Sequence, residues 1–155
     1  MLAVCIGILL GIPLVDLGMK YYVETHYDEE TEIPMWNGRL FLRYVKNEGM
    51  ACNLLEKKPA LVRWLSLTAV IPLVGYAVLI FTRRGRSVEK LSLSLMLGGA
   101  ISNLYDRFIR KHVVDYLGFK TKWKKWTNLT YNLGDLAIFA GGFGIMFHAL
   151  FGKKY

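Results

Sequence analysis

The spacing of uncharged stretches constrains this chain more than any other feature of its sequence. Asp, Glu, Lys and Arg are absent from residues 1–15, 64–82, 91–105 and 136–152. An α-helix rises about 1.5 Å per residue and the apolar core of a bilayer is about 30 Å thick, so a spanning helix needs roughly 20 residues. The stretch 64–82 meets that length almost unaided, and the others meet it when polar residues at one end are included. We therefore predict four transmembrane helices, over about residues 1–22, 60–82, 88–107 and 132–151.

These helices make the chain an all-α integral membrane protein with a single membrane domain over residues 1–155. Two longer loops, about 23–59 and 108–131, lie on one side of the membrane, and a short turn, about 83–87, lies on the other. Within the first loop, Asn37-Gly38 is typical of a two-residue hairpin turn between arms 31–36 and 39–45. We expect a small β-hairpin or sheet on the membrane surface, with Pro34 confining its arm to an edge. An interfacial segment is expected between the third and fourth helices.

The composition excludes other classes of protein. The chain is 54% hydrophobic, which is too apolar for a disordered chain, and its two cysteines are too few for a disulfide-stapled domain. The net charge of +8 accompanies more apolar sequence than is typical of nucleic-acid-binding proteins, so no nucleic-acid partner is expected. Charge alone does not settle the orientation. Of the 20 basic residues, 14 lie on the side of the long loops, whereas six lie densely around the short turn and the C-terminus.

Polar side chains interrupt the predicted helices at one end only. If all four stretches span, the first and third helices end, and the second and fourth begin, on the same side of the membrane. Ionisable groups at membrane depth are costly and usually mark a functional interior. The alternative is a bundle whose ends are merely wetted by water. The residues concerned are Asp16, Lys20, Asn103, Asp106, Arg107, Asn132 and Asp135.

The chemistry available on that side rests on carboxylates. The chain has no HExxH, CxxC, GxSxG or Gly-rich phosphate loop, so neither a metal site nor a cofactor is predicted. Asp115 follows the third helix and Asp135 begins the fourth. When two carboxylates share a site, like-charge repulsion keeps one protonated, which supplies an acid and a base for activating water against an amide. Two alternatives stay open: the aspartates are helix caps, or ion-pair partners of Arg107 and Lys20.

Five segments in a fixed order point to a known family. They are Asp16-Leu17-Gly18-Met19-Lys20, Asn47-Glu48-Gly49-Met50-Ala51-Cys52-Asn53, Gly98-Gly99-Ala100-Ile101-Ser102-Asn103-Leu104-Tyr105-Asp106-Arg107, Val113-Val114-Asp115-Tyr116 and Tyr131-Asn132-Leu133-Gly134-Asp135. Over nearly its whole length the chain resembles the lipoprotein signal peptidases (signal peptidase II), four-helix membrane aspartic proteases of bacteria. The family patterns are Asp-Gln-x-Thr-Lys, Asn-x-Gly-Ala-Ala-Phe-Gly, Gly-Gly-Ala-x-Gly-Asn-x-x-Asp-Arg, Val-Val-Asp-Phe and Phe-Asn-x-Ala-Asp.

The resemblance implies a role for each matching residue. Asp115 and Asp135 would form the catalytic dyad. The residues implied to support the dyad or bind substrate are Asp16, Lys20, Asn47, Gly49, Asn103, Asp106, Arg107 and Asn132. Simpler interpretations remain for two pairs: Asp106 with Arg107 as a helix-end ion pair, and Asp16 as a partner of Lys20 four residues on.

The resemblance also implies the reaction and its setting. The enzyme would hydrolyse the bond before a diacylglyceryl-modified cysteine in a prolipoprotein. It would be a monomer in the bacterial cell membrane, with both termini cytoplasmic and the active site near the outer leaflet, in contact with anionic lipid headgroups. Two alternatives from other classes are a small four-helix proton-coupled transporter and a non-catalytic paralogue that binds lipidated peptides.

Several positions depart from the family patterns. We interpret these as packing positions more than proton-handling ones, and expect the loop 50–53 to affect the fit of substrate or inhibitor. A basic aromatic segment, 120–126, is interpreted either as a lid over the dyad or as an interfacial anchor. The departing residues are Leu17, Met19, Met50, Cys52, Asn53, Ser102, Tyr116, Tyr131 and Gly134.

Overall fold

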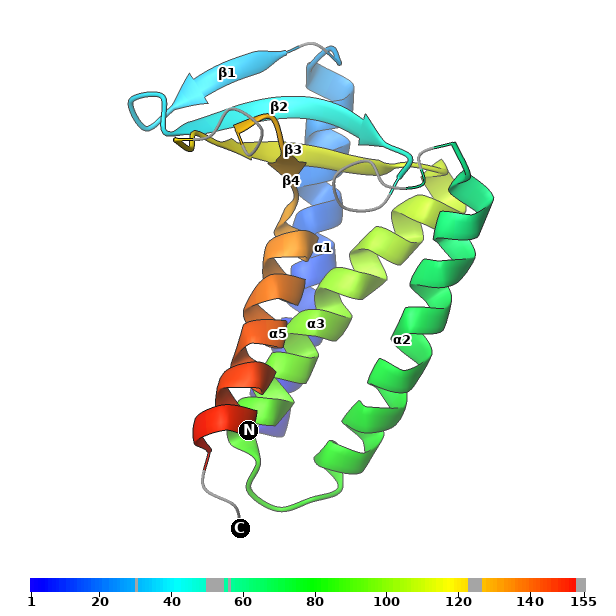
Figure 1. Ribbon diagram of the computed structural model, residues 1–155, viewed down its shortest axis with the longest axis vertical. Helices are drawn as coiled ribbons and strands as arrows, with labels where there is room; N and C mark the ends of the chain where they lie inside the picture. Colours follow the sequence, from blue (N-terminus) through cyan, green and yellow to red (C-terminus); the bar gives the residue numbers. More distant parts are fainter. Residues whose placement is uncertain (30, 50–54, 56, 123–126, 153–155) are drawn as a thin grey trace.

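Four long helices run side by side and carry a small antiparallel sheet across one end (Figure 1). The computed structural model describes residues 1–29, 31–49, 55, 57–122 and 127–152. Helix α1 begins and helix α5 ends at the end away from the sheet (Figure 1). The helices are α1 (Leu2–His26), α2 (Pro59–Phe81), α3 (Ser87–Tyr105) and α5 (Leu133–Phe151), and a π-helical turn, η2 (Asp106–Arg110), continues α3.

Helix α1 is longer than the sequence pattern predicts, since it continues to His26. Its last turn is held by side chains that bond back to the backbone. Thr25 Oγ1 donates to the Tyr21 carbonyl at 2.8 Å, and His26 Nδ1 lies 2.9 Å from the Tyr22 carbonyl. These contacts are back-bonds to carbonyls of the preceding turn of the helix. The first long loop therefore starts at about residue 27.

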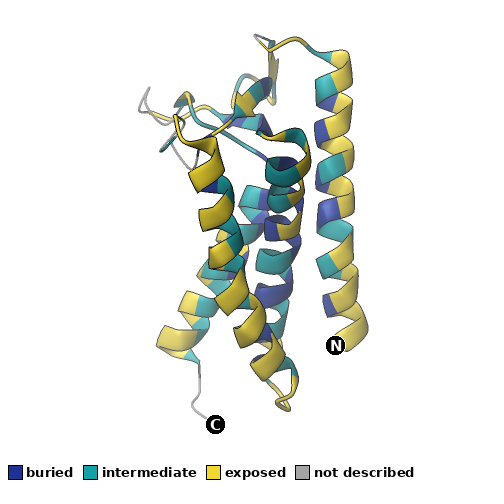
Figure 2. Cartoon of the chain, turned by 90° about the vertical axis from the view of Figure 1, so that its right-hand side faces the viewer, coloured by how far each residue is buried: buried dark blue, intermediate teal, exposed yellow. Residues whose placement is uncertain are grey.

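Three helices are long and apolar enough to cross a membrane: α1, α2 and α5. Many of their large apolar side chains are exposed, Ile71 and Leu79 of α2 among them (Figure 2). A helix that is apolar all round and yet exposed suits lipid as its solvent. Helix α3 does not meet the same criterion, and it contributes more buried residues than the others, including Ser92, Leu93 and Ser94.

Helix α3 packs against all three other long helices, most extensively against α5 and α1. Small residues make this close approach possible. A Cβ added at Gly99 would collide with the carbonyl oxygen of Gly134 in α5, and one at Gly141 would collide with α3. By contrast, a Cβ added at Gly7 or Gly11 of α1 would meet open space, so neither glycine serves a close helix contact within the described chain.

The sheet has the strand order β1-β2-β3-β4, with every pair antiparallel. The strands are β1 (Glu32–Met35), β2 (Leu40–Asn47), β3 (Val113–Phe119) and β4 (Thr130–Tyr131). The first two strands form the predicted hairpin, and Pro34 lies in the edge strand as expected. The predicted two-residue turn is wrong: Met35 pairs with Leu40, so the loop has four residues, and Trp36, Asn37 and Gly38 all have positive φ.

Strands β3 and β4 were not predicted, because residues 108–131 were expected to form only a loop. β3 pairs with β2 along most of its length and packs its apolar side chains on α1, where Val114 and Tyr116 form a core with Val23 and Tyr44. The interfacial lid or anchor expected around Trp123 and Trp126, and the divergent loop 50–53, lie outside the described residues.

Candidate active site

Asp115 and Asp135 reach one site from two different kinds of element. Asp115 lies on β3, and Asp135 lies in the first turn of α5. Asn132, which caps α5, connects them. Its side-chain amide donates to Asp115 Oδ1 at 2.7 Å, its backbone N–H donates to Asp135 Oδ2 at 3.3 Å, and its side-chain oxygen accepts from the Asp135 N–H at 2.8 Å. Asp135 is thus a helix cap, as one alternative held, and a neighbour of Asp115 as well.

Asp115 is almost wholly buried, at 2% exposure. Its second oxygen, Oδ2, accepts from Asn47 Nδ2 at 2.9 Å. Burial, and after it the negative charge of Asp135, raises the pKa of Asp115 to about 7, although the hydrogen bonds from Asn47 and Asn132 lower it. The carboxyl group therefore exchanges its proton near neutral pH, as an acid or base in catalysis must.

The partners of the two carboxylates are neutral amides. Asp135 Oδ1 accepts from Asn103 Nδ2 at 2.8 Å. Since each aspartate is held by amide donors, the alternative that they serve as ion-pair partners of Arg107 and Lys20 finds no support in these contacts.

Asn47 and Arg107 also hold the chain that follows β2. Asn47 Oδ1 accepts from the Gly49 N–H at 3.0 Å, and Arg107 donates to the Gly49 carbonyl at 2.9 Å. The simpler interpretation of Asp106 with Arg107 as a helix-end ion pair finds no support, because the guanidinium donates instead to the backbone beside the dyad. Asn47, Gly49 and Arg107 all lie at the site, as the sequence patterns implied.

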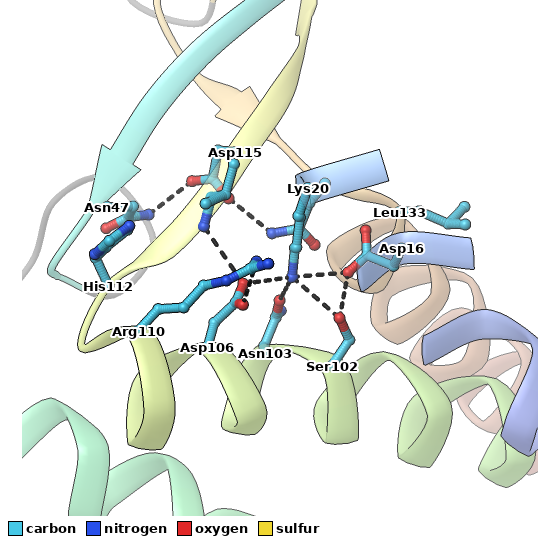
Figure 3. Close-up of polar contacts among 12 residues, drawn as sticks. Asp16, Lys20, Asn47, Ser102, Asn103, Asp106, Arg110, His112, Asp115 and Leu133 are labelled. Atoms are coloured by element: carbon cyan, nitrogen blue, oxygen red, sulfur yellow. Dashed lines mark hydrogen bonds and ion pairs between the residues drawn. The ribbon is translucent and has the colours of Figure 1, made fainter. Parts of the chain in front are cut away.

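A buried lysine, Lys20, points its ammonium group toward Asp16, Ser102, Asn103 and Asp106 (Figure 3). Lys20 is fully buried, and its Nζ lies 2.7 Å from Asp16 Oδ2 and 2.9 Å from Asp106 Oδ2. The same nitrogen donates to Asn103 Oδ1 at 2.9 Å. Because Asn103 in turn donates to Asp135, the lysine orients the amide that holds one half of the dyad. Lys20 is therefore enclosed within the protein and does not border the open part of the site.

Asp106 joins this ionic cluster to the outer part of the site. It is fully buried, and its Oδ1 accepts from Arg110 at 2.9 Å. Its Oδ2 accepts weakly from the backbone N–H of Val114, next to Asp115, at 3.4 Å. Asp106 therefore ties η2 to β3. Arg110 was not predicted, and its spacing of four residues from Asp106 was the available signal.

Two hydroxyls that the sequence patterns did not single out complete the cluster. Ser102 Oγ donates to Asp16 Oδ2 at 2.6 Å, and Tyr116 OH donates to Asp16 Oδ1 at 2.8 Å. Both residues depart from the family patterns and were interpreted as packing positions; Tyr116 does pack in the core, and both hydroxyls in addition bond to Asp16. Asp16 partners Lys20 as expected, and it also anchors these two hydroxyls.

One buried ionisable group lies at the other end of the bundle. Glu89, in the first turn of α3, accepts from Arg86 at 2.8 Å and from Tyr76 OH at 3.2 Å, and lies 3.6 Å from His148. The expectation that the far helix ends lack such groups is therefore wrong at this position. The contacts of Glu89 link α2, α3 and α5.

Together, the apolar helices and the paired carboxylates define a membrane protein with a buried acid–base site at one end. The family model described as signal peptidase (SPase) II matches residues 8–151, so the chain belongs to the signal peptidase II family, a family of proteases. It is 32% identical to a lipoprotein signal peptidase of Nitratidesulfovibrio vulgaris, over 90% of this chain and 85% of the relative. It is 33% identical to one from Yersinia enterocolitica, over 88% and 80%.

The fold also matches solved structures. A bacterial membrane enzyme solved by the in meso method superposes with a TM-score of 0.85 at 20% identity, covering 99% of this chain and 93% of that one. A second structure of that description has a TM-score of 0.82. The family membership confirms the resemblance and does not favour a transporter.

Proposed function

We propose that this chain is an aspartic endopeptidase that removes the signal peptide from prolipoproteins, cleaving before a diacylglyceryl-modified cysteine. The observation that carries the aspartic mechanism is the bridge by Asn132, which joins Asp115 of the sheet to Asp135 of α5. Membership in the signal peptidase II family supports the activity on prolipoproteins.

The contacts support a different role for each half of the dyad. Asp115, whose pKa lies near 7, supplies the proton, and Asp135 accepts one from the attacking water. Oxygen of that water bonds to the scissile carbonyl carbon while Asp115 protonates the carbonyl oxygen. As the carbon–nitrogen bond breaks, the proton held by Asp135 passes to the leaving amine, and Asp115 takes back a proton from one hydroxyl of the diol, which leaves the carboxylic acid product and restores the dyad. Asn103, Asn132 and Asn47 keep both carboxylates oriented throughout, because each donates to one of them.

The position of the site suits a lipid-linked substrate. The dyad lies where the sheet meets the helix ends, which corresponds to the headgroup zone if the helices span. Lipid chains can then remain in the bilayer while the peptide bond meets water. The Gly49 backbone held by Arg107 forms a fixed edge beside the dyad, which supports a role in binding the extended peptide.

We also infer the arrangement in the membrane. Helix α3 has 19 residues and continues directly into five residues of η2, which at 1.5 Å per residue is roughly 35 Å and enough to span. The proposed single membrane domain thus has four spanning helices, with the sheet outside the cell and both termini in the cytoplasm. Basic side chains near the start of α2, Lys57, Lys58 and Arg63, would attract anionic headgroups. The close helix contacts within one chain support a monomer.

The decisive experiment is cleavage of a diacylglyceryl-modified prolipoprotein in proteoliposomes by the wild type, Asp115→Asn and Asp135→Asn. We expect each substitution to lower the rate about a thousandfold, in line with the loss of a general acid or base. The exposed Asp28 provides a matched control, and Asp28→Asn should leave the rate unchanged. Activity above a tenth of the wild-type rate, by rough allowance, in either dyad variant would overturn the aspartic mechanism.

A further inference from the structure

Three departures from the family patterns surround one side chain, the carboxylate of Asp16. The patterns have Gly, Phe and Ala where this chain has Ser102, Tyr116 and Gly134. These residues are far apart in the sequence and come from α3, β3 and α5. Their convergence on one carboxylate indicates that the three positions act together.

Two of the departures add a hydroxyl, and both hydroxyls donate to Asp16. Ser102 approaches Oδ2 at 2.6 Å and Tyr116 approaches Oδ1 at 2.8 Å. Lys20 adds an ion pair to Oδ2 at 2.7 Å. All four residues are buried, with Asp16, Lys20 and Ser102 at 0% exposure. Short hydrogen bonds to a buried carboxylate are strong and costly to lose.

The third departure removes a methyl group. A Cβ added at Gly134 would lie 3.0 Å from Asp16 Oδ2, 3.0 Å from the Gly99 carbonyl and 3.1 Å from Asn132 Oδ1. These distances are tighter than ordinary van der Waals contact. The glycine therefore leaves room for the Asp16 carboxylate in the position where Ser102 and Tyr116 hold it.

Asp16 is connected to the dyad by two routes. The first runs through Tyr116, whose hydroxyl also accepts from the backbone N–H of Leu133 at 3.1 Å. Leu133 is the first residue of α5, two positions before Asp135, so this bond fixes the start of the helix that carries the dyad residue. The second route runs from Asp16 through Lys20 to Asn103, which donates to Asp135.

We propose that Ser102 and Tyr116 are positioning residues for the peptidase reaction: their hydroxyls lock Asp16 against the start of α5 and so hold Asp135 in its reactive place. This inference rests on the proposed dyad. Neither hydroxyl touches the dyad carboxylates: Ser102 acts through Asp16, and Tyr116 acts through Asp16 and through its bond to the Leu133 N–H. Burial raises the pKa of Tyr116 well above its usual range, so its hydroxyl stays a donor at all working pH values.

The hydroxyls also offset part of the negative charge of Asp16, which lies near Asp135. The charged groups around Asp16 are Lys20 on its own helix, Asp106 of η2 across Lys20, and Asp135 of α5. Removing a donor leaves more of the Asp16 charge uncompensated. The dyad then holds its proton to higher pH, so the acid limb of the pH–rate profile should move upward.

The test compares hydroxyl deletions that have matched controls in the same elements. Tyr116→Phe is compared with Tyr44→Phe, because Tyr44 belongs to the same buried core. Ser102→Ala is compared with Ser94→Ala, since Ser94 is buried in the same helix and donates only to the Lys90 carbonyl. The readouts are kcat, KM and the pH–rate profile for the diacylglyceryl-modified prolipoprotein in proteoliposomes.

For Tyr116→Phe we expect kcat to fall about tenfold, equivalent to about 1.4 kcal/mol, with KM changed less than about twofold. The acid limb should shift upward by about half a pH unit, and Ser102→Ala should move both readouts in the same direction. Both controls should match the wild type. Partial unfolding would lower only the amount of active enzyme, so a lower rate with an unshifted pH profile overturns the positioning role.

A second measurement does not depend on the stability of either single variant. Gly134→Ala is introduced into the wild type and into the Tyr116→Phe/Ser102→Ala background. Once the hydroxyls are gone, Asp16 can withdraw from the new methyl group, so the fold-loss in kcat should be smaller in that background. An equal fold-loss in both overturns the inference.

The aspartic mechanism and the positioning role of the hydroxyls can be refuted separately. If Asp115→Asn or Asp135→Asn remains active, the aspartic mechanism fails. If both are inactive while Tyr116→Phe keeps the wild-type rate and pH profile, the mechanism stands and the positioning role of the hydroxyls fails.

Discussion

Replacing Lys20 with Met should destabilise the fold strongly and in a pH-dependent way. The lysine nitrogen lies between two fully buried carboxylates, at 2.7 Å from Asp16 and 2.9 Å from Asp106. Met fills much of the same volume but leaves both carboxylates without their cation. Breaking a buried pair from one side costs about 3–5 kcal/mol.

The protein has one way to limit this cost, which is to bind a proton at one of the stranded carboxylates. A carboxyl group with an ordinary pKa near 4 is protonated at a cost of about 1.4 kcal/mol per pH unit above that value. The loss of stability caused by Lys20→Met is therefore limited to about 4 kcal/mol at pH 7 and about 1.5 kcal/mol at pH 5. Folding of Lys20→Met then takes up a proton that the unfolded chain does not hold, so its stability must fall, relative to the wild type, as pH rises.

Unfolding in micelles at about pH 5 and about pH 7 measures both quantities. A loss of about 4 kcal/mol corresponds to a melting temperature lower by roughly 10 °C for a chain of this size. Lys46→Met is the control, because Lys46 pairs with the exposed Glu29 on the sheet and should unfold like the wild type. Wild-type stability of Lys20→Met at both pH values would refute the claim that the buried cluster depends on its cation.

Three further perturbations test the site. Asn132→Ala should lower stability by about 1 kcal/mol through loss of the helix cap, and it should also reduce cleavage. Asn132→Ser should restore the cap but not the bond to Asp115. Equal cleavage by both variants and the wild type would contradict the bridging role. Gly99→Ala should destabilise the protein by about 1–3 kcal/mol because its methyl group meets the Gly134 carbonyl. Gly142→Ala, whose methyl group faces open space, should not destabilise it. Similar melting temperatures for the two variants would contradict the close α3–α5 contact. Because the pKa of Asp115 is raised to about 7, the wild type loses stability as pH rises from about 4 to about 7. Asp115→Asn lacks this loss, so it should gain stability relative to the wild type over that range. A difference in melting temperature that does not change with pH would count against the raised pKa.

The sequence predicts the helical part of the site well because helix ends are visible as polar interruptions of apolar stretches. Once four helices run antiparallel, Asp16 and Asn103 must lie at the same end as Asp135, and the structure places them there. Position along a helix is a local property, so it can be inferred from one stretch of sequence at a time.

The sheet was harder to predict because strand pairing is not local. Val113–Phe119 follows the helical residues closely and pairs with β2, some seventy residues earlier in the chain. The sequence of residues 108–131 does not by itself indicate which strand is the partner. The roles of Ser102 and Tyr116 were missed for a related reason: a hydroxyl on a helix or strand is informative only when the acceptor opposite it is known, and both face Asp16.

The strand that carries Asp115 has a consequence for the order in which the enzyme becomes active. β3 is held on one side by β2, which follows α1, and on the other by β4, which precedes α5. The two aspartates therefore cannot meet until the segments after α1 and after α3 have been delivered to the same side of the membrane and α5 has been made. A nascent chain that contains only α1, α2 and α3 holds most of the polar cluster but lacks Asp135, so the proposed dyad cannot form before the last helix is made.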